Sequence, residues 1–182
     1  MPLWLKHYQK QISVKFPNLK ALQNHVPQTG QLTWIGCRPA KKQEMATCRE
    51  ATVTKDAGIE GDHYRRKDGK RQVTLIQQEH LEAVGKMLGT DPIDPKLTRR
   101  NLVISGINLL ALKGKAIRIG ARVELEITGD CHPCSRMEDN LGDGGYSAMR
   151  GHGGVTARVL SGGQLRVGDP VRMIHQPKEQ YG

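Results

Sequence analysis

The sequence predicts a mostly β fold with helical insertions (α+β), built as a barrel or a sandwich. Short runs rich in β-forming residues recur along the chain and are separated by glycine turns. Among longer segments, only residues 77–88 have the spacing of an amphipathic helix. A chain of 182 residues is also long enough for one domain with a sizeable core.

The strands are predicted from their β-branched and aromatic residues and from the turns between them. They are Gln31–Cys37, Arg49–Val53, Gln72–Ile76, Leu102–Ser105, Ala116–Ile119, Arg122–Thr128, Val155–Leu160, Gln164–Val167 and Pro170–Ile174. Glycines at 120, 162, 163 and 168 mark turns between the later strands. This succession of short strands predicts a sheet whose neighbours are joined mainly by tight turns.

The long helix is predicted over Gln77–Leu88, where Leu81, Val84 and Leu88 fall on one face and Gly89 ends it. A shorter helix is predicted at Ser135–Leu141. The expected division is a basic arm over residues 1–30, a domain over 31–174 and a polar tail over 175–182. The arm carries four lysines and no acidic residue, and its first part has the pattern of a short helix.

The formal charge of +10 favours an anionic partner: a phosphate-bearing cofactor, a nucleic acid or an acidic surface. A solvated surface without a partner explains the charge equally well. A single Phe argues against a stacking platform for single-stranded nucleic acid. No apolar run is long enough to cross a membrane, so no membrane partner is expected. Four cysteines do not form a disulfide framework in a chain of this length, which indicates a cytoplasmic protein.

The stretch Gly129–Gly154 concentrates thiol, imidazole and guanidinium groups between two predicted strands. Cys131 and Cys134 form a CxxC motif with four interpretations: structural zinc, a thioredoxin-like dithiol, a single working thiolate, or buried inert thiols. A structural zinc site needs a second close pair of Cys or His ligands, which the sequence does not offer. The thioredoxin-like dithiol fold needs parallel βαβ units, which the strand pattern does not show. A thiolate at Cys134 is favoured, because the start of a helix and Arg136 both stabilise negative charge.

Further candidates are polar residues next to glycines or strand ends. Arg150, His152 and Gly153 form a glycine-rich turn suited to an anion, although such a turn before a strand looks the same without one. Arg99, Arg100 and Asn101 are a second candidate anion contact, with a solvated loop as the alternative. Asp62 and His63 either orient a base, bind a metal or cap a turn.

Seven segments in this order resemble the MOSC domain, the module named after the C-terminal part of molybdenum-cofactor sulfurases. They are WIGCRPAKKQEM, GIEGDHY, RQVTLIQQEHL, RRNLVISGINLLAL, PCSRMED, RGHGGVTARVLSGG and RVGDPV. Together they extend from about Gln31 to Met173, and the chain looks most like the small stand-alone bacterial members. The residues before Gln31 lie outside the resemblance.

The resemblance implies a MOSC-type β-barrel that binds the molybdenum cofactor (molybdopterin), with Cys134 as metal ligand and catalytic thiol. Around it, the implied cofactor contacts are Arg99, Arg100, Asn101, Arg136, Arg150, His152, Gly153, Asp62 and His63. The implied activity is either reduction of small N-hydroxylated compounds, with electrons from a separate electron-transfer protein, or sulfur carriage. No pyridoxal phosphate is expected. A dithiol redox protein using Cys131 and Cys134, or a non-catalytic basic binding module, remains the alternative.

Overall fold

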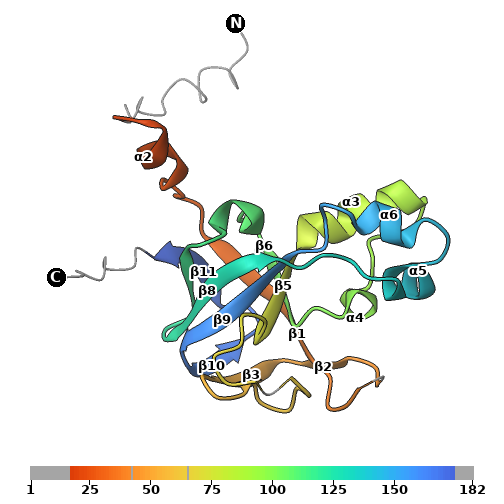
Figure 1. Cartoon of the computed structure of the whole chain (residues 1–182), viewed down its shortest axis with the longest axis horizontal. Coiled ribbons are helices and arrows are strands. Elements are labelled where there is room, and N and C mark those ends of the chain that lie inside the picture. Colours follow the sequence, from red (N-terminus) through yellow and green to blue (C-terminus); the bar gives the residue numbers. More distant parts are fainter. Residues whose placement is uncertain (1–16, 42, 65, 175–182) are drawn as a thin grey trace, which may run out of the picture.

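The computed structural model describes residues 17–41, 43–64 and 66–174. Within these residues, seven strands close into a barrel in the order β11-β7-β8-β9-β5-β6-β1, and β1 pairs back onto β11 (Figure 1). The barrel strands are β1 (Gly30–Cys37), β5 (Val73–Gln77), β6 (Leu102–Ser105), β7 (Ala116–Ile119), β8 (Val123–Asp130), β9 (Val155–Ser161) and β11 (Pro170–Ile174). The predicted mostly β class and the barrel are therefore confirmed.

The barrel is mixed because β5 and β6 run parallel, whereas the other neighbours are antiparallel. Parallel strands need a crossover connection, and helices α3 (Gln78–Leu88) and α4 (Pro95–Thr98) supply it. β2 (Ala46–Cys48) pairs with β1 outside the closed ring, and β10 (Gly163–Arg166), β3 (Glu50–Thr54) and β4 (Gly58–Ile59) form a small separate sheet.

Alternating side chains fill the barrel. On β8, Val123, Leu125 and Ile127 point inward and are completely buried, as the two-residue period of a strand requires. Other completely buried aliphatic residues come from β1, β5 and β6, including Leu32, Leu75 and Ile104. Each such side chain contributes about 1.5–3 kcal/mol by leaving water, so this core fixes the strand ends that surround the cavity described below.

Two further helices, α5 (Arg136–Leu141) and α6 (Gly145–Met149), lie near α3 at one side of the barrel (Figure 1). A second core joins α3, α5 and α6 to the outer face of the sheet through Leu81, Val84, Met137, Met149 and Ile76. α3 ends at Gly89, whose left-handed φ of 70° closes the helix as predicted. Its bounds differ from the prediction by one residue.

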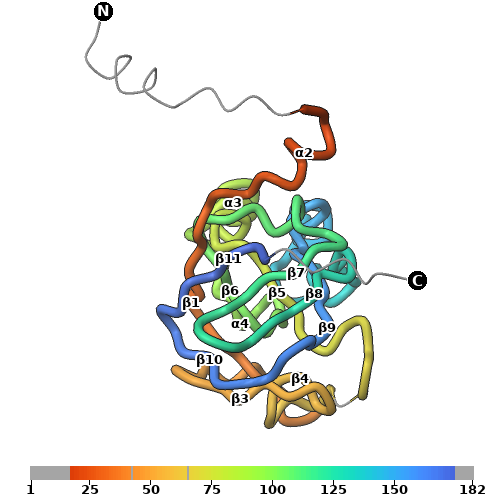
Figure 2. The backbone as a smooth tube through the Cα atoms, turned by 90° about the vertical axis from the view of Figure 1, so that its left-hand side faces the viewer, coloured from red at the N-terminus to blue at the C-terminus, as the bar shows by residue number. Residues whose placement is uncertain are grey.

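The chain leaves the barrel at both ends on the side of the β1–β11 closure (Figure 2). The short helix α2 (Leu19–Gln23) lies ahead of β1, and the 3₁₀ turn η1 (Leu109–Leu112) follows β6. Neither was predicted. The predicted helix near the start of the arm and the tail 175–182 lie outside the described residues. The expected division of the chain at 30 and 174 stays a prediction.

Candidate active site

A cavity of about 460 Å³ opens at one end of the barrel. It lies where β1 ends, where β5 and β6 begin, and where the chain leaves β8. Its lining is Arg38, Met45, Asp62, His63, Tyr64, Arg71, Thr74, Arg99, Arg100, Asn101, Cys131, His132, Pro133, Cys134 and Met137. Both thiols of the CxxC motif therefore share this lining with residues 30–96 positions earlier in the sequence, from Arg38 to Asn101. The volume is that of a site for a small molecule or cofactor.

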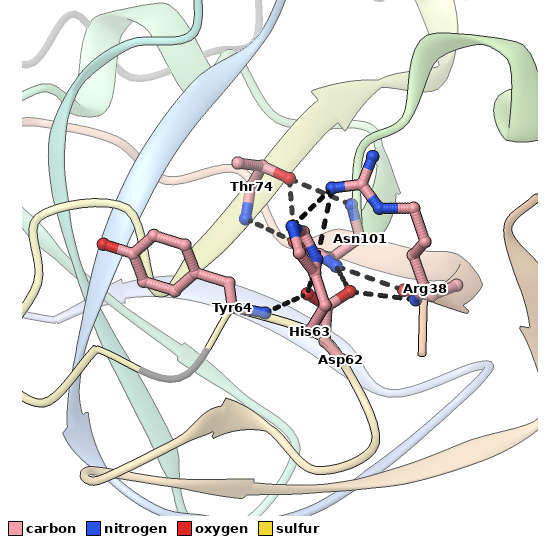
Figure 3. A network of polar contacts seen from close by, with 7 residues as sticks. Arg38, Asp62, His63, Tyr64, Thr74 and Asn101 are labelled. Atoms are coloured by element: carbon pink, nitrogen blue, oxygen red, sulfur yellow. Dashed lines mark hydrogen bonds and ion pairs between the residues drawn. The ribbon is translucent and has the colours of Figure 1, made fainter. Parts of the chain in front are cut away.

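Asn101 organises the inner part of the site (Figure 3). Its Oδ1 accepts hydrogen bonds from the backbone N–H of Thr74, at 3.0 Å, and from the Thr74 hydroxyl, at 2.8 Å. Its amide nitrogen donates to the Gly36 carbonyl, at 3.3 Å, and to Oδ2 of Asp62, at 3.0 Å. Because both ends of the buried amide have partners, it joins β1, β5 and the Asp62 turn at a fixed geometry.

Asp62 is also buried and accepts several hydrogen bonds. The backbone N–H of Arg38 donates to Oδ2 and that of Tyr64 to Oδ1, each at 3.0 Å, and Nδ1 of His63 lies 3.1 Å from Oδ1 (Figure 3). This carboxylate thereby orients the His63 imidazole and fixes the backbone at the end of β1. The prediction offered turn capping as one role for this pair, and these contacts include that role.

Arg38 brings a partly satisfied guanidinium to the cavity. Its Nη2 lies 3.0 Å from Nε2 and 3.2 Å from Nδ1 of His63. Its Nε and Nη1 are buried without a partner among the described residues. Burial lowers the pKa of Arg38, Asp62 opposes that shift and Arg136 adds to it. Unused donors on buried atoms of a cation are costly, so an anionic ligand would improve this site.

Arg100 is buried, and its fork donates only to backbone carbonyls. Nε donates to Gly153 at 2.7 Å, Nη1 to Thr98 at 2.7 Å, and Nη2 to Cys131 at 3.0 Å. Burial lowers the pKa of this guanidinium. The side chain holds three chain segments together and adds a positive charge that none of these hydrogen-bond partners neutralises.

The two thiols differ in exposure. Cys131 is buried, and Nη2 of Arg71 lies 3.6 Å from its sulfur in hydrogen-bonding geometry. Cys134 is exposed, and its carbonyl accepts a hydrogen bond from the backbone N–H of Met137 at 2.8 Å, just as α5 begins. The exposed thiol of the cavity is thus Cys134, whereas the buried thiol of Cys131 is contacted by the Arg71 guanidinium.

The site residues predicted from sequence fall into two groups. Cys134, Asp62, His63, Arg99, Arg100 and Asn101 line the cavity, whereas Arg136, Arg150, His152 and Gly153 are not among its lining residues. Arg136 lines an adjoining cavity of about 340 Å³, which shares Met45 and Arg99 with the first. The structure gives the positions of these residues, whereas the roles that the resemblance implies for them stay predictions.

The glycine-rich turn has structural contacts of its own. Arg150 is exposed at the end of α6. The His152 ring packs edge-on against His80, with ring centroids 4.8 Å apart. A Cβ on Gly153 would lie 2.2 Å from the Cys131 carbonyl oxygen, so glycine is required by close backbone approach. This turn brings the Gly153 carbonyl to Arg100.

Arg38 and Arg71 were not predicted as site residues. Arg38 directly follows a predicted strand, and Arg71 directly precedes another. The useful signal was their position at strand ends, which barrel closure brings to the same cavity. Four arginines and one carboxylate now line the cavity, so its charge favours an anionic ligand.

The described residues contain no helix that meets the length and hydropathy needed to span a bilayer. They also contain no grouping of three or more His, Cys, Asp or Glu arranged to hold a metal ion.

The structure defines the class of this protein: it is a closed mixed barrel, and the cavity at its mouth is cationic and carries two thiols. The MOSC domain family model matches residues 41–172, and the chain belongs to this family. No curated protein sequence matches the chain significantly.

Solved structures show the same fold. The YuaD protein of Bacillus subtilis aligns with a TM-score of 0.72 at 17% identity, covering 84% of this chain and 100% of that one. YiiM of Geobacillus stearothermophilus aligns at 0.65 with 15% identity, covering 82% and 77%. YiiM of Escherichia coli aligns at 0.60 with 15% identity, covering 81% and 71%. At these identities the likeness concerns the fold alone.

Proposed function

We propose that this MOSC protein binds the molybdenum cofactor in the 460 Å³ cavity and uses Cys134 as the protein ligand of the metal. The observation that carries the proposal is the lining itself: four arginines and an exposed thiol around one carboxylate. The cofactor has a phosphate group and a dithiolene, so it needs cationic donors and leaves a coordination position for a soft thiolate.

The residues present fit such a group. Arg38 has two buried N–H donors without partners among the described residues, and Arg99 faces both adjoining cavities. Bidentate guanidinium groups suit phosphate. Asn101 and Asp62 are occupied by one another and by the backbone, so they shape the wall rather than supply free donors. Arg71, which contacts the Cys131 sulfur, lines the same cavity as Cys134 and adds positive potential.

We further propose reduction of small N-hydroxylated compounds as the activity. The bound cofactor would supply two-electron redox chemistry at molybdenum. Removing oxygen from an N–O bond consumes two protons, and the cavity holds His63 and Tyr64 as groups able to donate them. His63 is oriented by Asp62, at 3.1 Å, and by Arg38, at 3.0 Å. Electrons would come from a separate electron-transfer protein.

The test is expression in a cofactor-producing host and anaerobic purification, followed by molybdenum analysis and pterin fluorescence. Wild-type protein and Cys131→Ser should retain molybdenum, whereas Cys134→Ser should lose it and remain folded. Arg118→Lys, in an exposed ion pair with Glu124, is the matched surface control. Unchanged molybdenum in Cys134→Ser would remove its role as ligand, and wild-type protein without pterin would refute cofactor binding.

Turnover separates the two activities implied by the family. A reductase keeps its molybdenum through many cycles of N-hydroxylated substrate and artificial electron donor. A sulfur carrier would instead transfer the outer sulfur of a Cys134 persulfide to an acceptor once, leaving the thiol, and would stop until a sulfur donor reloaded it. Reversible oxidation of Cys131 with Cys134 in protein lacking pterin would favour the dithiol alternative.

A further inference from the structure

A second pair of thiols lies outside the lining of the cavity. Cys37 is the last residue of β1 and Cys48 the last of β2. Their sulfur atoms are 3.5 Å apart. The cofactor proposal does not use these two cysteines.

The strand register explains this approach. β1 and β2 are antiparallel, with Ile35 opposite Cys48 and Cys37 opposite Ala46. Since alternate residues of a strand share a face, Cys37 and Cys48 point to the same side as diagonal neighbours. Both pack partly buried against the barrel core, which limits the rotamers that would separate them.

We propose that Cys37 and Cys48 are a modification site: a dithiol that oxidises reversibly to a cross-strand disulfide. The sulfur atoms must approach from 3.5 Å to the bond length of about 2.05 Å. Each cysteine ends its strand, so the β1–β2 pairing does not continue beyond it. A metal is a poorer occupant, because no third His, Cys, Asp or Glu among the described residues completes a ligand set.

The reaction balances with a small-molecule disulfide as oxidant. One cysteine thiolate attacks a sulfur of oxidised glutathione, and one glutathione thiol leaves. The second cysteine thiolate attacks the mixed disulfide, the Cys37–Cys48 bond forms, and a second glutathione thiol leaves with the other proton. Burial, with contributions from Cys48 and Asp62, raises the pKa of Cys37 to about 11. Thiol exchange is therefore faster at alkaline pH.

The cross-link encloses the segment between β1 and β2, which carries Arg38 and Met45 to the cavity wall. Arg38 directly follows Cys37, and its backbone N–H donates to Asp62 at 3.0 Å. A covalent ring closed at Cys37 and Cys48 removes conformations of this segment that are open in the reduced protein. The redox state of the pair would thus set how firmly Arg38 is held.

Peptide mapping distinguishes this disulfide from one at the CxxC motif. Trypsin does not cleave between Arg38 and Pro39, but it cleaves at Lys41 and Lys42. Cys37 then lies in peptide 21–41 and Cys48 in peptide 43–49, whereas Cys131 and Cys134 share peptide 123–136. A Cys37–Cys48 bond links two peptides. A Cys131–Cys134 bond leaves one peptide lighter by two hydrogens.

The experiment treats the full chain with oxidised glutathione at mildly alkaline pH, blocks free thiols and digests without reductant. We expect the linked pair 21–41/43–49, its disappearance with dithiothreitol, and a melting temperature higher by roughly 5–10 °C in the oxidised protein. Cys37→Ser and Cys48→Ser should abolish both effects. Absence of the linked pair, or glutathione remaining separately on both cysteines, would overturn the proposal, whatever the outcome for the cofactor.

Discussion

Replacing Arg100 with lysine would keep the positive charge at the barrel mouth but remove the planar fork. The guanidinium donates to three carbonyls, of Thr98, Cys131 and Gly153, at 2.7–3.0 Å. These come from the end of α4, the exit of β8 and the glycine turn before β9. A lysine ammonium has no geometry that reaches all three, so we count two hydrogen bonds as lost.

The magnitude follows from the burial of the group. A hydrogen bond to a charged donor contributes about 1.5–3 kcal/mol, so two lost bonds amount to about 3–6 kcal/mol. Water entering from the cavity would satisfy part of the released carbonyls. We therefore expect Arg100→Lys to lower the free energy of unfolding by about 2–4 kcal/mol.

The assay is urea denaturation. The slope of the unfolding free energy against urea concentration should be the same for the variant and the wild type. Arg118→Lys is the control, because Arg118 pairs with Glu124 at the surface, where the two side chains are 49% and 27% exposed. That change should cost less than about 1 kcal/mol. A loss for Arg100→Lys no larger than for the control would refute the reasoning, since the fork would then contribute no more than a surface ion pair.

Three further changes test other parts of the structure. Asn101→Leu should destabilise the chain by about 2–4 kcal/mol in urea, since it leaves the Thr74 N–H and the Gly36 carbonyl without partners; full stability would contradict the network. Gly154→Ala should cost more than Gly61→Ala in the same assay, because both have positive φ but only at Gly154 would a Cβ meet backbone, 2.0 Å from the Leu75 carbonyl oxygen; equal losses would exclude the clash. Burial and His152 lower the pKa of His80 below its ordinary 6.5. As the pH falls, His80 is therefore protonated in the unfolded chain before it is protonated in the folded one. Stability should therefore fall as pH drops below 6.5, less steeply in His80→Gln; identical pH profiles would disprove this linkage.

Much of the fold could be predicted because strands leave a local signature. Leu102–Ser105, Ala116–Ile119 and Pro170–Ile174 were predicted with their observed bounds. β2 was missed, because three residues after a polar loop carry too little pattern. α6 was missed because it begins at a glycine pair, which normally ends helices. The strand order was not predicted, since closure depends on pairing between residues far apart in the chain.

The site was predictable where unusual residue types cluster. Asp62 with His63, Arg99 to Asn101, and Cys134 were singled out separately, and all line one cavity. The sequence does not reveal which guanidinium keeps unused donors. Arg100 donates to backbone carbonyls, whereas Nε and Nη1 of Arg38 have no partner within the described part of the chain. Arg38 and Arg71 were missed because only their positions at strand ends mark them in the sequence. Their importance arises only when the barrel closes.

The direction of β1 has a practical consequence. The strand starts at Gly30, paired with Val171 of β11, and its other end leads into Arg38 at the cavity. Seven residue steps at about 3.3 Å separate Gly30 from Cys37 by roughly 23 Å. A fluorophore or surface tether attached just ahead of Gly30 would therefore leave the opening accessible. Immobilised protein should accept ligands and electron donors there as freely as protein in solution.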